Sequence, residues 1–159
     1  MMQTFLLDEE IKNKIIELSK NYPTKLSAIL PSLNLVQERY GFIPPEVETQ
    51  IAELLNIYPI QVREATTFYS LFYSKPLGQH RIYVCYNLSC CLEGSGKIIK
   101  HLMEKLGIQL NQTTNDGKFS LFKSPCLGAC ERAPVIIIDG IYHYNVTIEY
   151  IDKLLSELG

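Results

Sequence analysis

The chain has 159 residues, of which 47% are hydrophobic and 20% are charged, and its 15 basic and 17 acidic residues leave a formal net charge of −2. This length suits one domain, or a domain with an extension, and the balanced charge argues against a nucleic-acid partner or a disordered charged tail. No long apolar run suggests a membrane span, and the first five residues lack the pattern of a secretory signal, so we expect a soluble, cytoplasmic globular protein.

The first half of the sequence predicts a small bundle of helices, which we assign as an N-terminal helical domain over residues 1–75. Residues that favour helix starts and stops alternate there with apolar residues at helical spacing. The signals in chain order are Asp8 as an N-cap, an apolar stripe over Leu26–Tyr40 with Pro31 in the first turn and Gly41 at the end, a third helix opened by Pro44-Pro45, and a fourth opened by Pro59 whose apolar residues are Val62, Ala65, Phe68 and Tyr69.

The pattern changes near Ser74–Gly78, and we assign residues 76–159 to a second domain. Its elements are expected as strands at Arg81–Cys85, Phe119–Lys123 and Val135–Ile138, a helix capped by Ser95 and ended by Gly107, a tight turn at Asp139-Gly140 that pairs Ile141–Tyr144 antiparallel with the third strand, and a last helix capped by Thr147. The order strand, helix, strand, hairpin, helix predicts an α/β sandwich of thioredoxin-like size.

Five cysteines, all in the second half, carry the chemistry of this sequence. Four of them form two spaced pairs, Cys85-x4-Cys90 and Cys126-x3-Cys130, separated by 35 residues. Both pairs fall where predicted strands end, which is the usual place for a ligand in an open α/β sheet. Four thiolates from two loops can hold an iron–sulfur cluster or a structural zinc ion.

Spacing alone leaves several interpretations of these cysteines open. An x4 spacing also occurs in two-iron ferredoxins, whereas zinc ribbons more often use C-x2-C pairs. Four buried apolar thiols are a further alternative. A stand-alone thiol oxidoreductase is disfavoured because the C-x2-C active-site pattern is absent. We expect Cys91 to point away as a packed thiol, although it could replace Cys90. We also expect Gly94, Gly96 and Gly128, which have no Cβ, to let backbone N–H groups come close to sulfur.

Other candidate features carry less information. The chain has no glycine-rich nucleotide fingerprint, so we do not expect it to bind NAD or flavin by itself. His80, His101 and His143 are scattered, and His101 is expected to be a surface or packing residue. The aromatic segment Thr66–Tyr73 has two interpretations: packing between the two halves of the chain, or contact with another protein of a complex.

Several stretches resemble one known family, the small [2Fe–2S] subunit, of the 24-kDa type, of bacterial NADH–quinone oxidoreductase, which is respiratory complex I. The resemblance extends over nearly the whole chain, and the cysteine spacing matches the ligand pattern of that family. The stretches that carry it are Leu35–Pro44, Ala65–Tyr69, Asp116–Ser120 and Cys126–Pro134, the last with the sequence Cys-Leu-Gly-Ala-Cys-Glu-Arg-Ala-Pro.

The resemblance implies an α/β, thioredoxin-like [2Fe–2S] ferredoxin domain preceded by a small helical bundle. It implies one [2Fe–2S] cluster with Cys85, Cys90, Cys126 and Cys130 as ligands. It also implies that the cluster exchanges single electrons with the FMN of a partner flavoprotein that binds NADH. The chain would then be part of an enzyme, not catalytic alone, on the cytoplasmic side of the inner membrane.

Two departures from the family pattern accompany this resemblance. Ser124-Pro125 precedes Cys126 where relatives often have an acidic residue, which would shift the reduction potential, and Cys91 directly after a ligand is not part of the pattern. Related subunits occur in NAD-linked hydrogenases and formate dehydrogenases, which remain the alternative parent complexes, beside a structural-zinc thioredoxin-like binding module.

Overall fold

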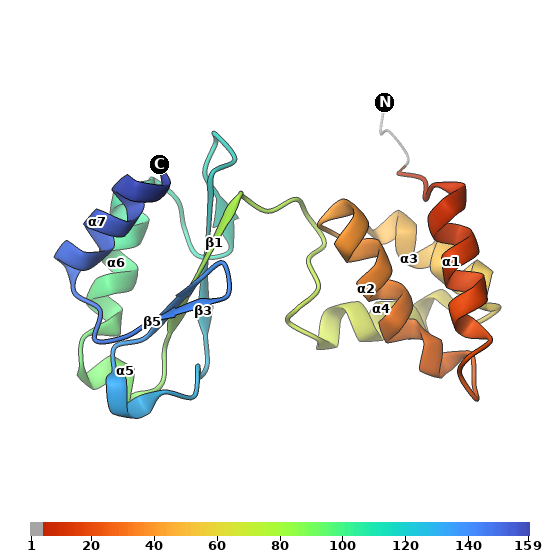
Figure 1. The fold of residues 1–159 in the computed structure, drawn as a ribbon, viewed down its shortest axis with the longest axis horizontal. Coiled ribbons are helices and arrows are strands. Elements are labelled where there is room, and N and C mark those ends of the chain that lie inside the picture. Colours follow the sequence, from red (N-terminus) through yellow and green to blue (C-terminus); the bar gives the residue numbers. More distant parts are fainter. Residues whose placement is uncertain (1–4) are drawn as a thin grey trace. The chain divides into compact units, whose positions relative to one another are not determined.

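The computed structural model describes residues 5–159. Residues 1–4, which hold most of the segment behind the expectation of no secretory signal, lie outside the described residues. The chain divides into two compact units, Met1–Pro76 and Leu77–Gly159 (Figure 1). That residues 1–75 and 76–159 are separate domains stays a prediction. Among the described helices, none is both long and apolar enough to cross a membrane.

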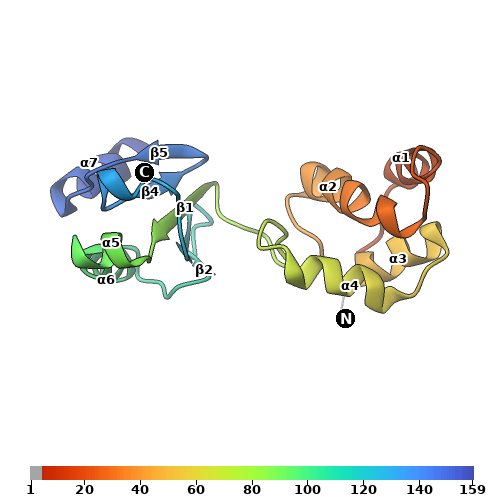
Figure 2. The same cartoon turned by 90° about the horizontal axis from the view of Figure 1, so that it is seen from below.

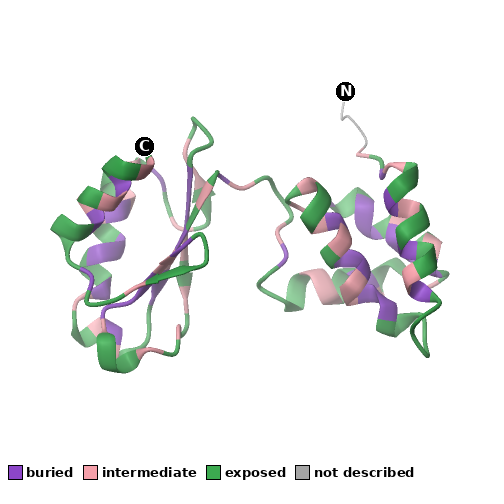
Figure 3. Ribbon diagram, in the orientation of Figure 1, coloured by how far each residue is buried: buried purple, intermediate pink, exposed green. Residues whose placement is uncertain are grey.

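The first unit is a bundle of helices whose apolar faces meet in a common core. Figure 3 shows the buried stretches of these helices turned toward one another. The elements are α1 (Glu9–Ser19), the 3-10 turn η1 (Leu26–Ala28), α2 (Ile29–Tyr40), α3 (Pro45–Leu55) and α4 (Pro59–Phe68). The largest fully buried side chains are Ile15, Leu33, Val36, Ile43, Val47, Ile51 and Leu55.

Local sequence sets the ends of these helices largely as predicted. The Asp8 carboxylate accepts a hydrogen bond from the Ile11 N–H at 2.8 Å, which satisfies a free donor at the start of α1. Pro31 lies in the first turn of α2, and Gly41 ends that helix with a left-handed φ of 81°. These predictions are confirmed, as are the proline starts of α3 and α4.

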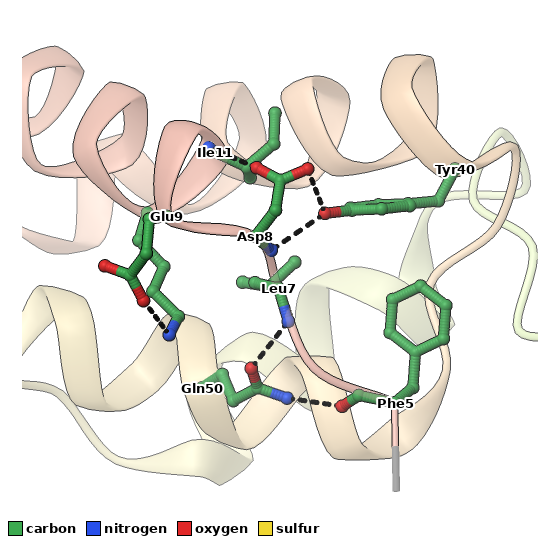
Figure 4. Close-up of polar contacts among 8 residues, drawn as sticks. Phe5, Leu7, Asp8, Glu9, Ile11, Tyr40 and Gln50 are labelled. Carbon is green, nitrogen blue, oxygen red and sulfur yellow. Dashed lines mark hydrogen bonds and ion pairs between the residues drawn. The ribbon is translucent and has the colours of Figure 1, made fainter. Parts of the chain in front are cut away.

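The segment that leads into α1 is fastened to α2 and α3 by polar side chains (Figure 4). The Gln50 side chain accepts from the Leu7 N–H and donates to the Phe5 carbonyl, at 2.9 and 2.8 Å. The Tyr40 hydroxyl donates to Asp8 and accepts from the Asp8 N–H. The Ile11 N–H, and after it the Tyr40 hydroxyl, lower the pKa of Asp8.

Helix α4 departs from the prediction at its end. The sequence groups Phe68 and Tyr69 with Val62 on one apolar face, but Val62 is fully buried while Phe68 is 80% exposed and Tyr69 38% exposed. Helix α4 ends at Phe68, and the rings of Phe68 and Tyr69 pack edge to face on each other, 5.0 Å apart, instead of entering the core. Both interpretations of the Thr66–Tyr73 segment stay predictions.

The second unit is a mixed sheet with two long helices on the same side in both views (Figures 1 and 2). The strand order is β2-β3-β1-β4-β5; β1 and β3 are parallel, and the other neighbouring pairs are antiparallel. The elements are β1 (His80–Cys85), α5 (Leu88–Leu92), α6 (Ser95–Leu106), β2 (Gln112–Thr113), β3 (Phe119–Ser124), η2 (Cys130–Arg132), β4 (Ile136–Ile138), β5 (Ile141–His143) and α7 (Ile148–Leu158). The predicted α/β class, with helices first, is confirmed.

Hydrophobic alternation orients this sheet toward its helices. Ile82 and Val84 in β1 are fully buried and belong to one core with apolar residues of α6 and α7. The predicted turn at Asp139-Gly140 is confirmed, because both residues have positive φ and β4 pairs antiparallel with β5. The Thr147 cap of α7 is also confirmed, with its hydroxyl accepting from the Tyr150 N–H at 3.2 Å.

The start of α6 contradicts one prediction. Gly94, with a φ of 94°, occupies the cap position, and no side chain caps the helix. Ser95 is the first helical residue and is fully buried, with its hydroxyl 3.8 Å from the Cys91 sulfur. A side chain caps a helix from the N-cap position, where it can accept from the free N–H groups of the first turn. Ser95 lies one residue beyond that position, so the predicted Ser95 cap is wrong.

Candidate metal centre

The sheet topology brings both cysteine pairs to one end of the second unit. Cys85 is the last residue of β1, and its register partner Ser124 is the last residue of β3. Because these strands are parallel, the segments that follow them leave the sheet at the same end. Strand β4 begins at this end and β5 runs antiparallel to it, so the residues around His143 lie at this end as well. We name residues 85–97, 123–135 and 143–150 the cysteine end.

Backbone and side-chain hydrogen bonds fasten the cysteine-bearing segments to one another. The Tyr86 N–H donates to the Ser124 carbonyl at 2.8 Å, and the Cys85 N–H donates to the Val135 carbonyl at 3.0 Å. The Asn87 side chain donates to the Pro125 carbonyl at 3.0 Å. The segment after β1 is therefore held against the segment that carries Cys126.

The first pair, Cys85 and Cys90, is buried. These side chains are 2% and 1% exposed and pack with Val135 in a small apolar cluster. Burial first, and then the hydrogen bond with the Cys85 thiol, raises the pKa of Cys90 to about 11. Negative charge on Cys85 and on Cys130 acts in the same direction, while the Val135 N–H opposes it. Cys85, Cys90 and Cys130 are therefore close enough to interact electrostatically.

The second pair, Cys126 and Cys130, is exposed. The Gly128 N–H donates to the Cys126 sulfur at 3.4 Å, and Gly128 has a left-handed φ of 70°, which glycine adopts without strain. Cys130 opens the 3-10 turn η2, which Figure 1 places at the same end of the sheet as α5.

The four predicted site residues are thus gathered at one end but not closed into a single set. Among residues 5–159, no three His, Cys, Asp or Glu side chains lie close enough together to hold a metal ion. The donor chemistry nevertheless fits a sulfur-ligated iron group. Two buried thiols hydrogen-bond to each other, and two exposed thiols follow on the adjoining segment. Which cysteines bind iron stays a prediction.

The neighbours of these cysteines partly match the sequence expectations. The Gly128 N–H donates to the Cys126 sulfur, whereas the Gly94 N–H donates to the Cys91 carbonyl at 3.1 Å, so the prediction for Gly94 stays untested. The prediction for Gly96 stays untested. Cys91 is partly buried and lines a groove with Val146 and Ile148, beside the Ser95 hydroxyl.

Each of the three histidines has a partner outside the cysteine pairs. His101 Nε2 lies 2.7 Å from an Asp152 oxygen and joins α6 to α7, which confirms its expected packing role. His80 Nδ1 lies 2.7 Å from Asp139 in the hairpin turn. His143 Nδ1 lies 3.0 Å from the Tyr150 hydroxyl, and burial lowers the pKa of His143.

Sequence reasoning missed helix α5 and the residues that it exposes. Leu88 and Leu92 lie at its two ends and are 71% and 78% exposed, next to Cys90 on the buried side. Five residues are too few for helical periodicity to stand out. The one signal in the sequence was Asn87, whose side-chain oxygen accepts from the Leu88 N–H at 2.7 Å.

Comparisons with known proteins agree on one family. A family model described as thioredoxin-like [2Fe–2S] ferredoxin matches residues 15–159. The second E-type subunit of the NADH-quinone oxidoreductase of Rhizobium meliloti is 39% identical over 146 residues, covering 92% of this chain and 87% of that protein. The E-type subunit of the same oxidoreductase of Rickettsia felis is 39% identical over 160 residues, covering 99% of this chain and 96% of that protein.

The fold also resembles a solved structure. The crystal structure of an NAD+-reducing [NiFe]-hydrogenase in the air-oxidized state superposes with a TM-score of 0.67 at 19% identity. The match covers 79% of this chain but 22% of the hydrogenase chain. At this level of identity the likeness concerns the fold alone.

Proposed function

Because the chain belongs to the thioredoxin-like [2Fe–2S] ferredoxin family, we propose that it is the electron-transfer subunit of an NADH–quinone oxidoreductase, respiratory complex I. The chain carries one [2Fe–2S] cluster, and single-electron exchange is the chemistry that such a cluster supplies. The observation that carries this proposal is 39% identity, over 99% of the chain, to a protein named as a subunit of that oxidoreductase. The chain serves as part of an oxidoreductase and is not catalytic alone.

Cys85, Cys90, Cys126 and Cys130 are the proposed ligands. The buried pair supplies two sulfurs whose positions are fixed by the end of β1, by α5 and by the Val135 backbone. The exposed pair supplies two more from a segment fastened to α5 through the Asn87 side chain. A [2Fe–2S] cluster needs two protein sulfurs for each iron, which suits two separate pairs.

The surroundings of the exposed pair can offset negative charge. Four thiolates with two irons and two sulfides carry about −2 when oxidised and about −3 when reduced. The Gly128 N–H points at the Cys126 sulfur, and Arg132 follows Cys130 by two residues. The Arg132 guanidinium lies over the Tyr144 ring at 4.8 Å, which holds this cation at the cysteine end.

The proposed partner is the flavoprotein subunit that binds NADH and FMN. The sequence of this chain has no glycine-rich dinucleotide fingerprint, so hydride chemistry must come from another protein of the complex. Within such a complex the chain would lie at the cytoplasmic side of the inner membrane as a peripheral subunit.

Purification of the complex through a tag on this chain tests the proposal. We expect a flavoprotein that holds FMN, together with subunits that give NADH-dependent quinone reduction. Recovery of the chain with hydrogenase or formate dehydrogenase subunits, and without quinone-reducing subunits, would instead support the alternative parent complexes.

A further inference from the structure

Two apolar side chains of the cysteine end cover the buried cysteine pair. Leu127 and Ala129 pack against the small cluster that the buried pair forms with Val135. Both are partly buried, whereas Cys126 before them and Cys130 after them are exposed. One short segment therefore presents its thiols to solvent and its apolar side chains to the buried pair. We name Leu127 and Ala129 the cover.

This arrangement keeps the four thiols from meeting. In the part of the chain that the structure describes, no three side chains of the metal-binding kinds lie close enough together to hold an ion. The Cys126 sulfur accepts from the Gly128 N–H at 3.4 Å, so it is turned along its own segment. Cys130 lies within electrostatic range of Cys90. The displacement that would bring the exposed sulfurs onto the buried pair therefore concerns this segment and the cover that it includes.

The cover lies between two fastened points of the backbone. Before it, the Pro125 carbonyl accepts from the Asn87 side chain at 3.0 Å. After it, the Arg132 carbonyl accepts from the Asn145 N–H at 2.9 Å. Between these points Gly128 has a left-handed φ of 70°, and glycine enters and leaves that conformation without the steric penalty of a Cβ. The stretch around Gly128 is therefore the part that can change while both ends stay in place.

We propose that the exposed pair is the entry site for the [2Fe–2S] cluster, and that the cover keeps the buried pair closed until the exposed pair has bound. The inference rests on the proposed function, because it assigns an order to the four proposed ligands. A cluster that arrives on exchangeable thiolates first meets the thiols that solvent reaches, Cys126 and Cys130. It reaches the buried pair only after Leu127 and Ala129 have left it, which is a local opening of one short segment.

Each ligand exchange is balanced without a change of oxidation state. A cysteine sulfur forms a bond to iron while the bond from iron to an outgoing thiolate breaks, and the proton of the cysteine passes to the outgoing sulfur. Iron and sulfide keep their charges, so the exchange needs no oxidant or reductant. The barrier peculiar to the buried pair is the apolar contact that Leu127 and Ala129 lose when they leave it.

Transfer of a glutathione-ligated [2Fe–2S] cluster to the full iron-free chain tests this order. Rapid mixing followed by visible circular dichroism measures the loading rate, because the signal appears when the protein holds the cluster asymmetrically. Leu127→Ala shortens the cover, so less apolar contact has to be broken, and we expect loading about three- to tenfold faster with the same final iron content. In the iron-free chain the same variant should also raise the rate at which an alkylating reagent labels Cys90.

Two double variants test which pair binds first. Cys85→Ser/Cys90→Ser keeps the exposed pair and should still take up the cluster, in a form that excess glutathione removes at least about tenfold faster than from the unsubstituted chain. Cys126→Ser/Cys130→Ser lacks the entry site and should take up the cluster at least about tenfold more slowly. Far-ultraviolet circular dichroism checks that both remain folded. If either does not fold, the loading rate of Leu127→Ala decides alone.

Leu92→Ala is the matched control. Leu92 ends α5 at the cysteine end and is 78% exposed, so its truncation removes little buried contact and should leave the loading rate unchanged. An unchanged rate in Leu127→Ala, equal acceleration in Leu92→Ala, or faster uptake by the chain without the exposed pair than by the chain without the buried pair would each overturn the entry order. Failure of the unsubstituted chain to bind any cluster would instead contradict the ligand assignment and the proposed function.

Discussion

The two cysteine pairs of the second unit have the same donor atoms and opposite surroundings. Cys85 and Cys90 are held in the protein interior by a strand and a short helix, whereas Cys126 and Cys130 lie on an exposed segment. The sheet core fixes the first pair before any iron is bound. The second pair lies at the surface, where another protein can approach it. The proposed site therefore has a buried half and an exposed half.

Substitution of the proposed ligands should have the largest effect, because it removes the bound iron. Cys90→Ser and Cys126→Ser each remove a proposed ligand, so we expect near-complete loss of bound iron from both, whether the lost sulfur is buried or exposed. Cys91→Ser is the matched control and should keep its iron and its visible absorption. Iron loss in Cys91→Ser, with iron retained in Cys90→Ser, would reverse the assignment of these neighbouring cysteines.

Thiol labelling of the iron-free chain should separate the pairs by reactivity. Alkylating reagents react with thiolates that they can reach, and burial raises the pKa of Cys90 to about 11. At pH 8 we therefore expect Cys126 and Cys130 to label at least about tenfold faster than Cys90. As long as the pH stays below the pKa of Cys90, each increase of one pH unit should raise the rate of Cys90 labelling about tenfold. Mass spectrometry of peptides at timed intervals measures both rates; equal rates for the two pairs would argue against the buried first pair.

The stability of the iron-free chain should also distinguish the pairs. Cys85→Ser places a hydroxyl in a nearly closed apolar site, which we expect to lower the free energy of unfolding by about 1–3 kcal/mol. Cys126→Ser changes an exposed position and should stay within about 0.5 kcal/mol of the unsubstituted chain. Urea denaturation without iron provides the measurement. A larger cost at Cys126 than at Cys85 would be inconsistent with the burial of these two residues.

The smallest expected effect concerns the helices that begin at the cysteine end. Helix α7 has a side-chain cap from Thr147, whereas α6 begins at Gly94 without one. Thr147→Ala should therefore lower the free energy of unfolding by about 1 kcal/mol, while Thr147→Ser keeps the hydroxyl and should have little effect. Thermal unfolding of the two variants measures this difference. Equal destabilisation by both would assign the role of Thr147 to packing of its methyl group.

Features that depend on neighbours in sequence could be predicted from the sequence. Asp8, Gly41, the prolines that open α3 and α4, and the Asp139-Gly140 turn each act through local backbone geometry. The position of each cysteine pair near the end of a predicted strand also followed from the local pattern, whereas the meeting of the two pairs depends on the parallel pairing of β1 with β3. The local features need no knowledge of the tertiary structure.

Features that depend on tertiary packing could not be predicted. The burial of Cys85 and Cys90, against the exposure of Cys126 and Cys130, depends on which segments Val135 and the core residues cover. The exposure of Phe68 has the same origin, because helical spacing alone does not show how far along a helix its apolar face is covered by other elements. Ser95 failed as a cap because Gly94 takes the turn conformation one residue earlier.

The central claim, that these cysteines hold one [2Fe–2S] cluster, is tested most directly by metal analysis of the purified chain combined with EPR spectroscopy. The account predicts two iron atoms and two acid-labile sulfides per chain, and a paramagnetic signal that appears on one-electron reduction and is lost in Cys90→Ser. A colourless protein that contains a single zinc ion and gives no signal after reduction would contradict it.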